Sequence, residues 1–526
     1  MHQSITRRGA LAGAAALTLA TAPAARAQSA GDPVATTTHG RVRGVVERGI
    51  RVFKGIRYGA DTQASRFGPP RRPEAWTDVR PALAYGASSP QRGRGETISE
   101  DCLFLNVWTP ALRDGAKRPV LFYIHGGAYS SGSGSSPLYD GVNLCTQGDV
   151  VVVTVNHRLN IFGYLYLGRE ADPRFADGGN AGQLDLVLAL QWVRDNIAEF
   201  GGDPSRVTVF GQSGGGAKIA TMMAQPVAKD LFHRAWTMSG QQVTASGPMN
   251  ATRRGQAFLD ELKLPFERHR ELLTMPVERL LEGMAAPDPV LGFGGVYFGP
   301  VLDERWLFRH PFYPDAAPQS AAIPMILGNT HDETRAFLGG DPKNYELTWE
   351  ELPAKLPAEY RVDISPDLVV AEYRRLYPHY SPSDVFFAAT TAGRSWRGAI
   401  IETEERAKQG GPTWAYQVNF RSPLEGGRRG APHGIDIPLM FNNIAQPGSN
   451  TGSGPEAQAC ARAMSEALLA FARTGDPNHA GMPAWKKFDL ATRTHMIFDT
   501  VSQAQDDPRG AERRLFEKVP FIQAGT

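Results

Sequence analysis

The sequence predicts an α/β fold with a mostly parallel central sheet flanked by helices. Three short, almost continuously apolar runs predict strands buried on both faces, at 119–124 (PVLFYI), 150–155 (VVVVTV) and 206–210 (RVTVF). Between the second and third, residues 184–200 repeat apolar side chains at helical spacing. Strand, helix and strand in this order are typical of parallel pairing. Later strand candidates are 234–238, 324–327 and 414–418.

Two stretches, at about 250–320 and 340–410, interrupt this rhythm with helical patterns and many prolines. We expect them to be helical insertions that roof the active site rather than separate domains. The chain shows no internal repeat and no low-complexity linker, and the Ser/Gly-rich run at 130–136 is only seven residues long. Residues 28–526 are therefore predicted to form one domain.

The first 27 residues are typical of a bacterial signal peptide. Arg7 and Arg8 precede an apolar run at 9–21, and Ala25-Arg26-Ala27 is a small-x-small cleavage site. The paired arginines favour the twin-arginine route, although a general secretion signal can also carry two arginines. The apolar run is too short for a membrane anchor. We expect a mature protein that starts near Gln28 and is periplasmic or secreted.

Charge and cysteine content exclude several classes of function. Basic residues number 56 and acidic residues 54, a net charge of +2, so no basic surplus is left for a nucleic-acid partner. The three cysteines, Cys102, Cys145 and Cys460, form no CxxC pair and cannot all pair internally. A zinc or redox site is therefore not supported.

The sequence Gly211-Gln212-Ser213-Gly214-Gly215 matches the G-x-S-x-G motif of a nucleophile elbow. A lone match is weak, but a predicted strand precedes this one and residues 216–223 (GAKIATMM) can form a helix after it. The tight turn between them requires small neighbours and directs the helix N-terminus at the reacting oxygen. We therefore predict that Ser213 is a catalytic nucleophile.

A second glycine-rich turn, His125-Gly126-Gly127-Ala128-Tyr129, follows the strand at 119–124. Small residues there allow backbone N–H groups to approach a substrate carbonyl and stabilise the oxyanion that forms on it. His125 is a tempting base, but its place in this motif favours a structural role.

Longer motifs resemble those of the type B carboxylesterases, the family that includes cholinesterases and bacterial para-nitrobenzyl esterases. The resemblance extends from about Thr38 to Asp499. It is carried by Phe53-Lys54-Gly55-Ile56-Arg57-Tyr58, by the run from Glu100 to Asn106 (EDCLFLN), by the run from Asn180 to Gly215 and by the run from Phe471 to Asn478 (FARTGDPN). The resemblance implies the α/β-hydrolase fold and a serine hydrolase without a cofactor.

The resemblance also implies the remaining site residues. Glu333, in the run GNTHDE, matches the acid of the family's catalytic triad, and His433, in the run APHGID, matches its base. The order Ser213, Glu333, His433 is the one that this fold requires. The oxyanion donors would be the N–H groups of Gly127, Ala128 and Gly214. Asp332 remains an alternative acid, and His433 could instead be a surface loop residue.

The family pattern also implies two further features: a buried Arg66–Glu100 salt bridge, and an acyl pocket to which the segment 292–300 contributes. The chain departs from that pattern at three positions. Gln212 stands where cholinesterase-like members carry Glu. Cys102 has no upstream cysteine in the mature chain, so the family's first disulfide loop is absent. Because the choline site of the cholinesterases depends on that loop, specificity for choline esters is not supported. Ala128 stands where many members have Gly.

These observations predict a carboxylic ester hydrolase that acts on a small-molecule ester through an acyl-enzyme on Ser213. The same machinery could cleave amide, thioester or lactone bonds. A non-catalytic cholinesterase-like binding protein is a further alternative, but such proteins typically lose a triad residue. The sequence does not predict the natural substrate or the oligomeric state.

Overall fold

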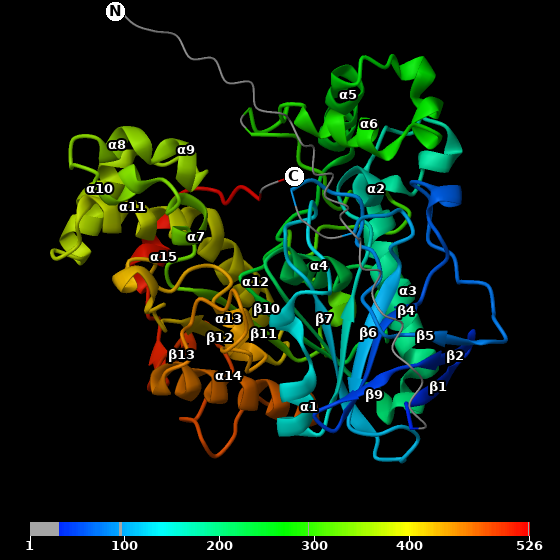
Figure 1. Ribbon diagram of the computed structural model, residues 1–526. Coiled ribbons are helices and arrows are strands. Elements are labelled where there is room, and N and C mark those ends of the chain that lie inside the picture. The colour runs from blue at the N-terminus through cyan, green and yellow to red at the C-terminus, as the bar shows by residue number, and fades with distance from the viewer. Residues whose placement is uncertain (1–30, 94–96, 293, 524, 526) are drawn as a thin grey trace, which may run out of the picture. The chain divides into compact units, whose positions relative to one another are not determined.

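The fold is organised around one large mixed β-sheet (Figure 1). The structure is a computed structural model that describes residues 31–93, 97–292, 294–523 and 525. The predicted signal peptide, residues 1–27, lies outside the described residues. In spatial order the strands are β14 (Gln503–Asp506), β13 (Thr494–Phe498), β12 (Thr413–Val418), β11 (Met325–Thr330), β10 (Arg234–Met238), β9 (Gly202–Gln212), β7 (Arg118–Ile124), β8 (Val151–Val155), β6 (Phe104–Thr109), β4 (Ile50–Arg57) and β3 (Val45–Glu47).

All neighbours from β13 to β8 pair in parallel, and only the outer strands pair antiparallel. The mostly parallel sheet expected from the sequence is thus confirmed, and each of the six predicted strands lies on one of β7 to β12. The antiparallel strands β3, β4, β6 and β14 had no prediction from their own patterns. A separate small sheet contains β1 (Val34–Thr37), β2 (Gly40–Arg43) and β5 (Val79–Pro81).

Two helical layers explain why the central strands are apolar on both faces. In β7, the side chains of Val120, Phe122 and Ile124 pack in one core cluster with helix α3 (Ala181–Asn196). The alternate side chains of Leu121 and Tyr123 pack in another cluster with helix α14 (Pro455–Thr474). Alternation of side chains along a strand sends successive residues to opposite faces, so a sheet covered twice needs apolar residues throughout.

The helices that cover the sheet or lie at its end are as follows. They are α1 (Val142–Gly148), α2 (Asn160–Tyr164), α3 (Ala181–Asn196), α4 (Gly214–Met222), α5 (Pro248–Glu261), α6 (Val277–Glu282), α7 (Arg335–Leu338), α8 (Leu352–Lys355), α9 (Pro357–Tyr360), α10 (Pro366–Leu376), α11 (Pro382–Thr391), α12 (Arg397–Lys408), α13 (Asp436–Met440), α14 (Pro455–Thr474) and α15 (Gly510–Phe516).

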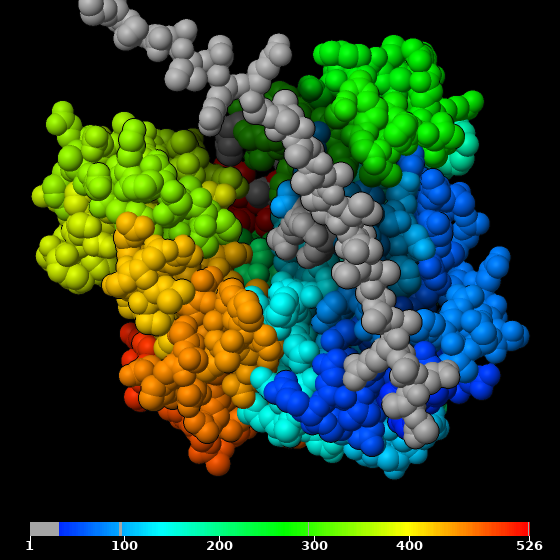
Figure 2. Space-filling model, in the orientation of Figure 1, coloured from blue at the N-terminus to red at the C-terminus, as the bar shows by residue number. Residues whose placement is uncertain are grey.

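The two stretches predicted to be insertions are helical. The first contains α5 and α6, and the second contains α8 to α12 with a π-helical turn at Ala392–Trp396 between α11 and α12. Figure 1 shows both at the same end of the sheet. In Figure 2 they stand on either side of a hollow, between the bright green and the yellow-green atoms. Residues 33–526 form one compact unit.

The expected Arg66–Glu100 ion pair forms, and both side chains are buried. Arg66 Nε lies 2.7 Å from Glu100 Oε2, and Arg66 Nη1 donates to the carbonyls of Leu272 and Met275 at 2.8 Å. The pair therefore fixes the first insertion to the segment that precedes β6. Because one guanidinium satisfies a carboxylate and two carbonyls, removal of either partner would leave buried polar groups unpaired.

The three cysteines are buried and none is bonded to another. Among the described residues, no helix has the length and apolarity needed to cross a bilayer.

Candidate active site

Ser213 lies on a sharp turn between β9 and α4, as the motif predicts. Its backbone has φ 55° and ψ −127°, a strained conformation for a residue with a side chain, and its N–H donates to the Met238 carbonyl at 2.7 Å. A Cβ on Gly215 would lie 2.0 Å from the Ile124 carbonyl oxygen. The neighbouring glycine thus lets α4 start directly against the end of β7.

The predicted oxyanion residues come from two different turns that touch. Gly127 and Ala128 follow β7 with φ 89° and 54°, and Gly214 is the first residue of α4. A Cβ on Gly214 would lie 2.0 Å from the Ala128 carbonyl oxygen. Among the backbone hydrogen bonds of the described residues, none uses the N–H of Gly127 or Ala128. Both donors therefore remain available for a ligand oxygen beside Ser213.

His433 and Glu333 form a close hydrogen-bonded pair, from His433 Nδ1 to Glu333 Oε2. Glu333 follows β11 and is fully buried. Its other carboxylate oxygen accepts from the hydroxyl of Ser239 at 2.5 Å and from the N–H of Thr330 at 2.8 Å. These contacts fix the carboxylate and, through it, the orientation of the imidazole.

The alternative acid, Asp332, faces away from this pair. Its carboxylate accepts from the N–H of Ala431 at 2.8 Å and lies 3.2 Å from His331 Nδ1. The carboxylate that meets His433 is therefore Glu333. His433 lines the cavity with Ser213 and is not a surface loop residue.

Burial and charge act in opposite directions on the His433–Glu333 pair. Burial disfavours the imidazolium, but the charge and hydrogen bond of Glu333 outweigh it, so the pKa of His433 is raised above its ordinary value. Burial likewise disfavours the Glu333 carboxylate, yet His433 and the hydrogen bonds to it keep its pKa lowered. The charge of Arg394 opposes the rise at His433, whereas Asp436 adds to it. Burial, followed by the charge of Glu333, raises the pKa of Asp436 to about 7.

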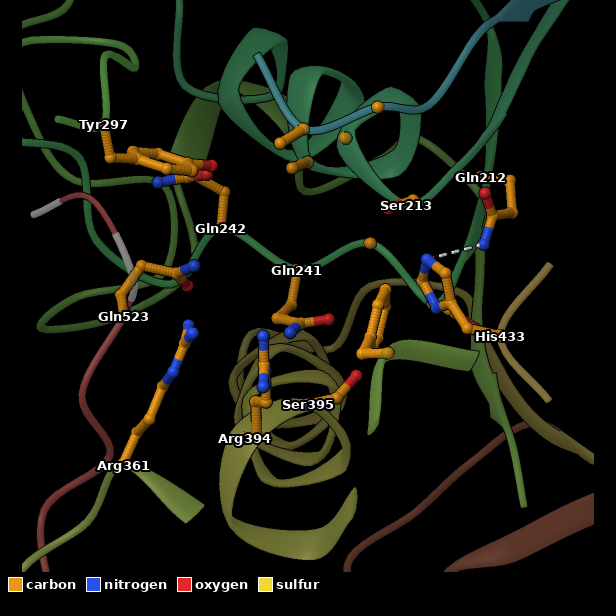
Figure 3. Close-up of a pocket in the computed structure, with 17 residues that line it drawn as sticks. Gln212, Ser213, Gln241, Gln242, Tyr297, Arg361, Arg394, Ser395, His433 and Gln523 are labelled. Carbon is orange, nitrogen blue, oxygen red and sulfur yellow. Dashed lines mark hydrogen bonds between the residues drawn. The ribbon is translucent and has the colours of Figure 1, made fainter. Parts of the chain in front are cut away.

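The second ring nitrogen of His433 contacts Gln212. The distance from Gln212 Nε2 to His433 Nε2 is 3.0 Å (Figure 3). With Nδ1–H donated to Glu333, Nε2 carries a lone pair that the Gln212 amide can donate to. Among the described residues, the hydrogen-bond partners of the ring are thus Glu333 and Gln212, and Ser213 is not one of them. Catalytic hydrogen bonds are often long in unliganded sites and shorten when substrate binds.

Ser213 and His433 open onto a cavity of about 450 Å³. The other residues that line it are Gly127, Ala128, Gln212, Gly214, Ala217, Ser239, Gly240, Gln241, Gln242, Tyr297, Phe337, Arg361, Arg394, Ser395 and Gln523. Of the segment 292–300 that the resemblance assigned to the acyl pocket, Tyr297 reaches the cavity. Among the described residues, no group of three or more His, Cys, Asp or Glu is arranged to hold a metal ion.

A known protein family matches almost the whole chain. The family model described as "Carboxylesterase family" matches residues 31–516. The chain belongs to the carboxylesterase family.

Curated relatives and solved structures match over almost the whole chain. The para-nitrobenzyl esterase of Bacillus subtilis (strain 168) is 32% identical over 502 residues, which cover 91% of this chain and 98% of the relative. The phenmedipham hydrolase of Pseudarthrobacter oxydans is 33% identical, over 87% of this chain and 93% of the relative. A Geobacillus stearothermophilus carboxylesterase of known structure has a TM-score of 0.82 and 38% identity, over 92% and 99% of the two chains. The α/β-hydrolase fold and the ester hydrolase activity follow from these matches.

Sequence reasoning missed one residue of the esterase that supports the predicted oxyanion turn. Lys218, on α4, is fully buried, and its Nζ donates to the carbonyls of Ala128 and Gly214 at 2.6 and 3.3 Å. Burial lowers the pKa of Lys218 to about 7. The Lys218 amino group thus links the Ala128 turn to the first residue of α4, and both residues line the cavity. A lysine inside the otherwise apolar run GAKIATMM is the signal that could have pointed to it.

His125 has the structural position that its motif predicts. Its ring is buried and stacks on that of His157 at 4.7 Å, and its Nδ1 lies 2.8 Å from the Gly126 carbonyl. Burial, the charge of Lys218 and His125 together keep the pKa of His157 well below its ordinary value. The stacked pair therefore packs beneath the oxyanion turn, and His125 does not line the cavity.

Replacing Lys218 by methionine should lower kcat about tenfold or more, with a smaller change in KM. The apolar side chain keeps the volume but removes the donor to Ala128, so the oxyanion turn loses its fixed position. The same variant should also bind a trifluoromethyl ketone less tightly, because the ketone forms a tetrahedral adduct. The loss of ketone affinity should be proportional to the loss of kcat/KM. Lys229→Met, an exposed position, is the matched control. If the variant loses kcat and thermal stability but binds the ketone as tightly as the unaltered protein does, Lys218 is merely part of the core.

Replacing Gln212 by glutamate should move the acid limb of the kcat/KM profile to higher pH. His433 accepts a proton only when it is neutral. A second carboxylate beside Nε2 stabilises the imidazolium and should raise the pKa of His433 by about one unit or more. Activity would then be lost earlier on acidification. The measurement is the pH profile of kcat/KM with a neutral ester.

The same variant should also discriminate against negative charge. A carboxylate next to the nucleophile repels an anionic ester, and about 1.4 kcal/mol of repulsion is a tenfold change in rate. Paired neutral and anionic esters of equal size measure the effect. An unshifted acid limb together with equal rate changes for both esters would reduce Gln212 to a structural residue of the turn.

Proposed function

We propose that Ser213, His433 and Glu333 form the catalytic triad of this esterase, with the N–H groups of Gly127, Ala128 and Gly214 as its oxyanion hole. The observation that carries the proposal is the His433–Glu333 pair, which faces the same cavity as the strained Ser213 turn. A neutral imidazole oriented by a buried carboxylate is suited to accept a proton from a hydroxyl.

Acylation begins when an ester carbonyl enters the cavity beside Ser213. As Ser213 Oγ attacks the carbonyl carbon, its proton passes to His433 Nε2, which exchanges its contact with Gln212 for one with the hydroxyl. The carbonyl oxygen becomes negative and accepts hydrogen bonds from the oxyanion N–H groups. The imidazolium, stabilised by Glu333, then returns the proton to the alcohol oxygen as the carbon–oxygen bond breaks.

Deacylation repeats these steps with water in place of Ser213. His433 removes a proton from the water, the resulting tetrahedral intermediate occupies the same oxyanion hole, and the Ser213 oxygen leaves with the proton from His433. Hydrolysis in two covalent steps requires no group beyond the side chains and backbone named here.

The cavity volume favours a small-molecule ester. About 450 Å³ falls in the range of pockets that bind compounds of drug size. Since the Bacillus subtilis relative is named a para-nitrobenzyl esterase, para-nitrobenzyl and para-nitrophenyl esters of graded acyl length are suitable first substrates.

Ser213→Ala and His433→Ala should each lower kcat for such an ester by about 10⁴-fold or more, because triad members act as a unit. Glu333→Gln should be nearly as severe, since the amide cannot stabilise the imidazolium. Asp332→Asn, one residue away, is the matched control for the acid. A larger loss in Asp332→Asn than in Glu333→Gln would overturn the assignment of the acid.

We further propose that residues 1–27 export the esterase to the periplasm or the medium. Support comes from the Arg7-Arg8 pair, the short apolar run and the Ala25-Arg26-Ala27 site. Replacing both arginines by lysine should leave the protein in the cytoplasm if the twin-arginine route is used, as cell fractionation and immunoblotting would measure. Export of the double variant would contradict that route, and retention of the unaltered chain in the cytoplasm would contradict export itself.

A further inference from the structure

Two guanidinium groups line the catalytic cavity, and none of the described residues that line it is acidic. Arg361 and Arg394 both come from the second insertion, and in Figure 3 both side chains extend towards the ring of residues that surrounds the cavity. The remaining polar side chains of the lining are neutral, apart from His433. A cavity with this charge pattern attracts an anion.

Unusual backbone conformations place both arginines. Arg394 lies in the π-helical turn Ala392–Trp396, and π-helical turns are rare and frequent at functional sites. Arg361 ends α9 in the left-handed conformation, with φ 58°. A side chain at positive φ is strained unless its surroundings hold it there. The chain thus departs from regular helix twice, each time at a residue whose guanidinium reaches the cavity.

The two guanidinium groups repel each other and share an acidic neighbour. Arg394 Nη1 lies 3.3 Å from Glu359 Oε2, and the same carboxylate acts on Arg361. Burial and then the charge of Arg361 lower the pKa of Arg394 to about 10, so it remains protonated at neutral pH. A carboxylate on the substrate would offset both the repulsion between the two guanidinium groups and the free-energy cost of burying their charge.

The pair is close to the reacting groups. The Arg394 guanidinium lies over the ring of Phe337 at 5.2 Å, and that ring lies 4.7 Å from the ring of His433. Its charge also opposes protonation of His433. On the other side, the charge of Arg361 acts on the Tyr297 phenol. The two guanidinium groups therefore belong to the cavity in which the ester must lie.

We propose that Arg361 and Arg394 form a subsite for a carboxylate carried by the substrate, so that the natural substrates are esters with a free carboxylate a short chain away from the scissile carbonyl. The inference rests on the proposed esterase mechanism and adds the substrate class. The neutral Gln212 agrees with it, because a glutamate there would repel such a substrate.

The test compares charged esters with neutral amide isosteres in two arms. In the acyl arm the pair is mono-para-nitrophenyl adipate and the para-nitrophenyl ester of adipic acid monoamide. In the alcohol arm it is para-carboxyphenyl hexanoate and para-carbamoylphenyl hexanoate. The quantity measured is the ratio of kcat/KM for the anionic ester to that for its isostere. The arm with the higher ratio identifies the half of the substrate that bears the carboxylate.

Arg361→Gln and Arg394→Gln should each lower this ratio about tenfold or more in that arm, since each removes a charge-assisted hydrogen bond. Arg394→Lys should retain more of the ratio than Arg394→Gln. The matched control is Arg375→Gln on α10, an exposed arginine paired with Glu372 outside the cavity lining, which should leave the ratio unchanged. An unchanged ratio in Arg361→Gln and Arg394→Gln, in both arms, overturns the subsite.

A measurement on the unaltered protein keeps the proposal testable if the variants do not fold. Adipate should inhibit hydrolysis of para-nitrophenyl hexanoate competitively, at concentrations at least tenfold below those of adipamide, and added salt should weaken the inhibition. Equal inhibition by the two compounds overturns the subsite. Failure of the proposed function would be distinct, because the unaltered protein would then hydrolyse neither the anionic nor the neutral esters.

Discussion

The site depends on one close backbone contact, between the turn after β7 and the turn after β9. The carbonyl of Ala128 approaches Gly214 so closely that any side chain at Gly214 would collide with it. This contact brings N–H groups from two strands to one side of Ser213. It also requires positive φ angles at Gly127, Ala128 and Ser213. At Ala128 and Ser213, which carry side chains, such a conformation costs about 1–3 kcal/mol each. The buried sheet and the Lys218 ammonium hold the strained turns in place.

The charges around that contact have a consistent arrangement. Glu333 accepts hydrogen bonds from Ser239 and Thr330, and Lys218 donates to the carbonyl of Ala128 on the neighbouring turn. Within the described part of the chain, the carboxylate that hydrogen-bonds to His433 is that of Glu333, which is not one of the residues lining the cavity. The cavity itself has two guanidinium groups and, at Gln212, a neutral amide. In the proposed mechanism such a site would stabilise the negative charge that develops during ester cleavage, and with the proposed subsite it would admit substrates that already carry one.

How much the sequence could predict varied with the range of the interactions. The strands β7 to β12 and the Ser213 turn depend on local patterns, such as continuous apolar runs and glycines that flank a serine, and these were predicted. Glu333 and His433 are 100 residues apart in the chain and meet only through the fold. No local pattern distinguishes Glu333 from Asp332, so their roles came from the family resemblance.

Lys218, Arg361 and Arg394 were not predicted, for physical reasons that differ. A lysine on a helix is usually exposed, and only the three-dimensional structure shows the two carbonyls that satisfy Lys218 inside the core. The arginines lie in the second insertion, where a π-helical turn and a left-handed residue break the periodicity that sequence patterns rely on. The two edge strands, β3 and β14, are short and at least partly exposed, which weakens their apolar signal.

The most direct measurement of the central claim is the detection of the covalent intermediate on Ser213. Rapid acid quenching of the esterase with a para-nitrophenyl ester, followed by proteolysis and mass spectrometry, would show where the acyl group is attached. We expect one acyl group, on the peptide that carries Ser213, formed together with a burst of para-nitrophenol. Steady ester turnover without any acylated peptide, or with the acyl group on another residue, would contradict it.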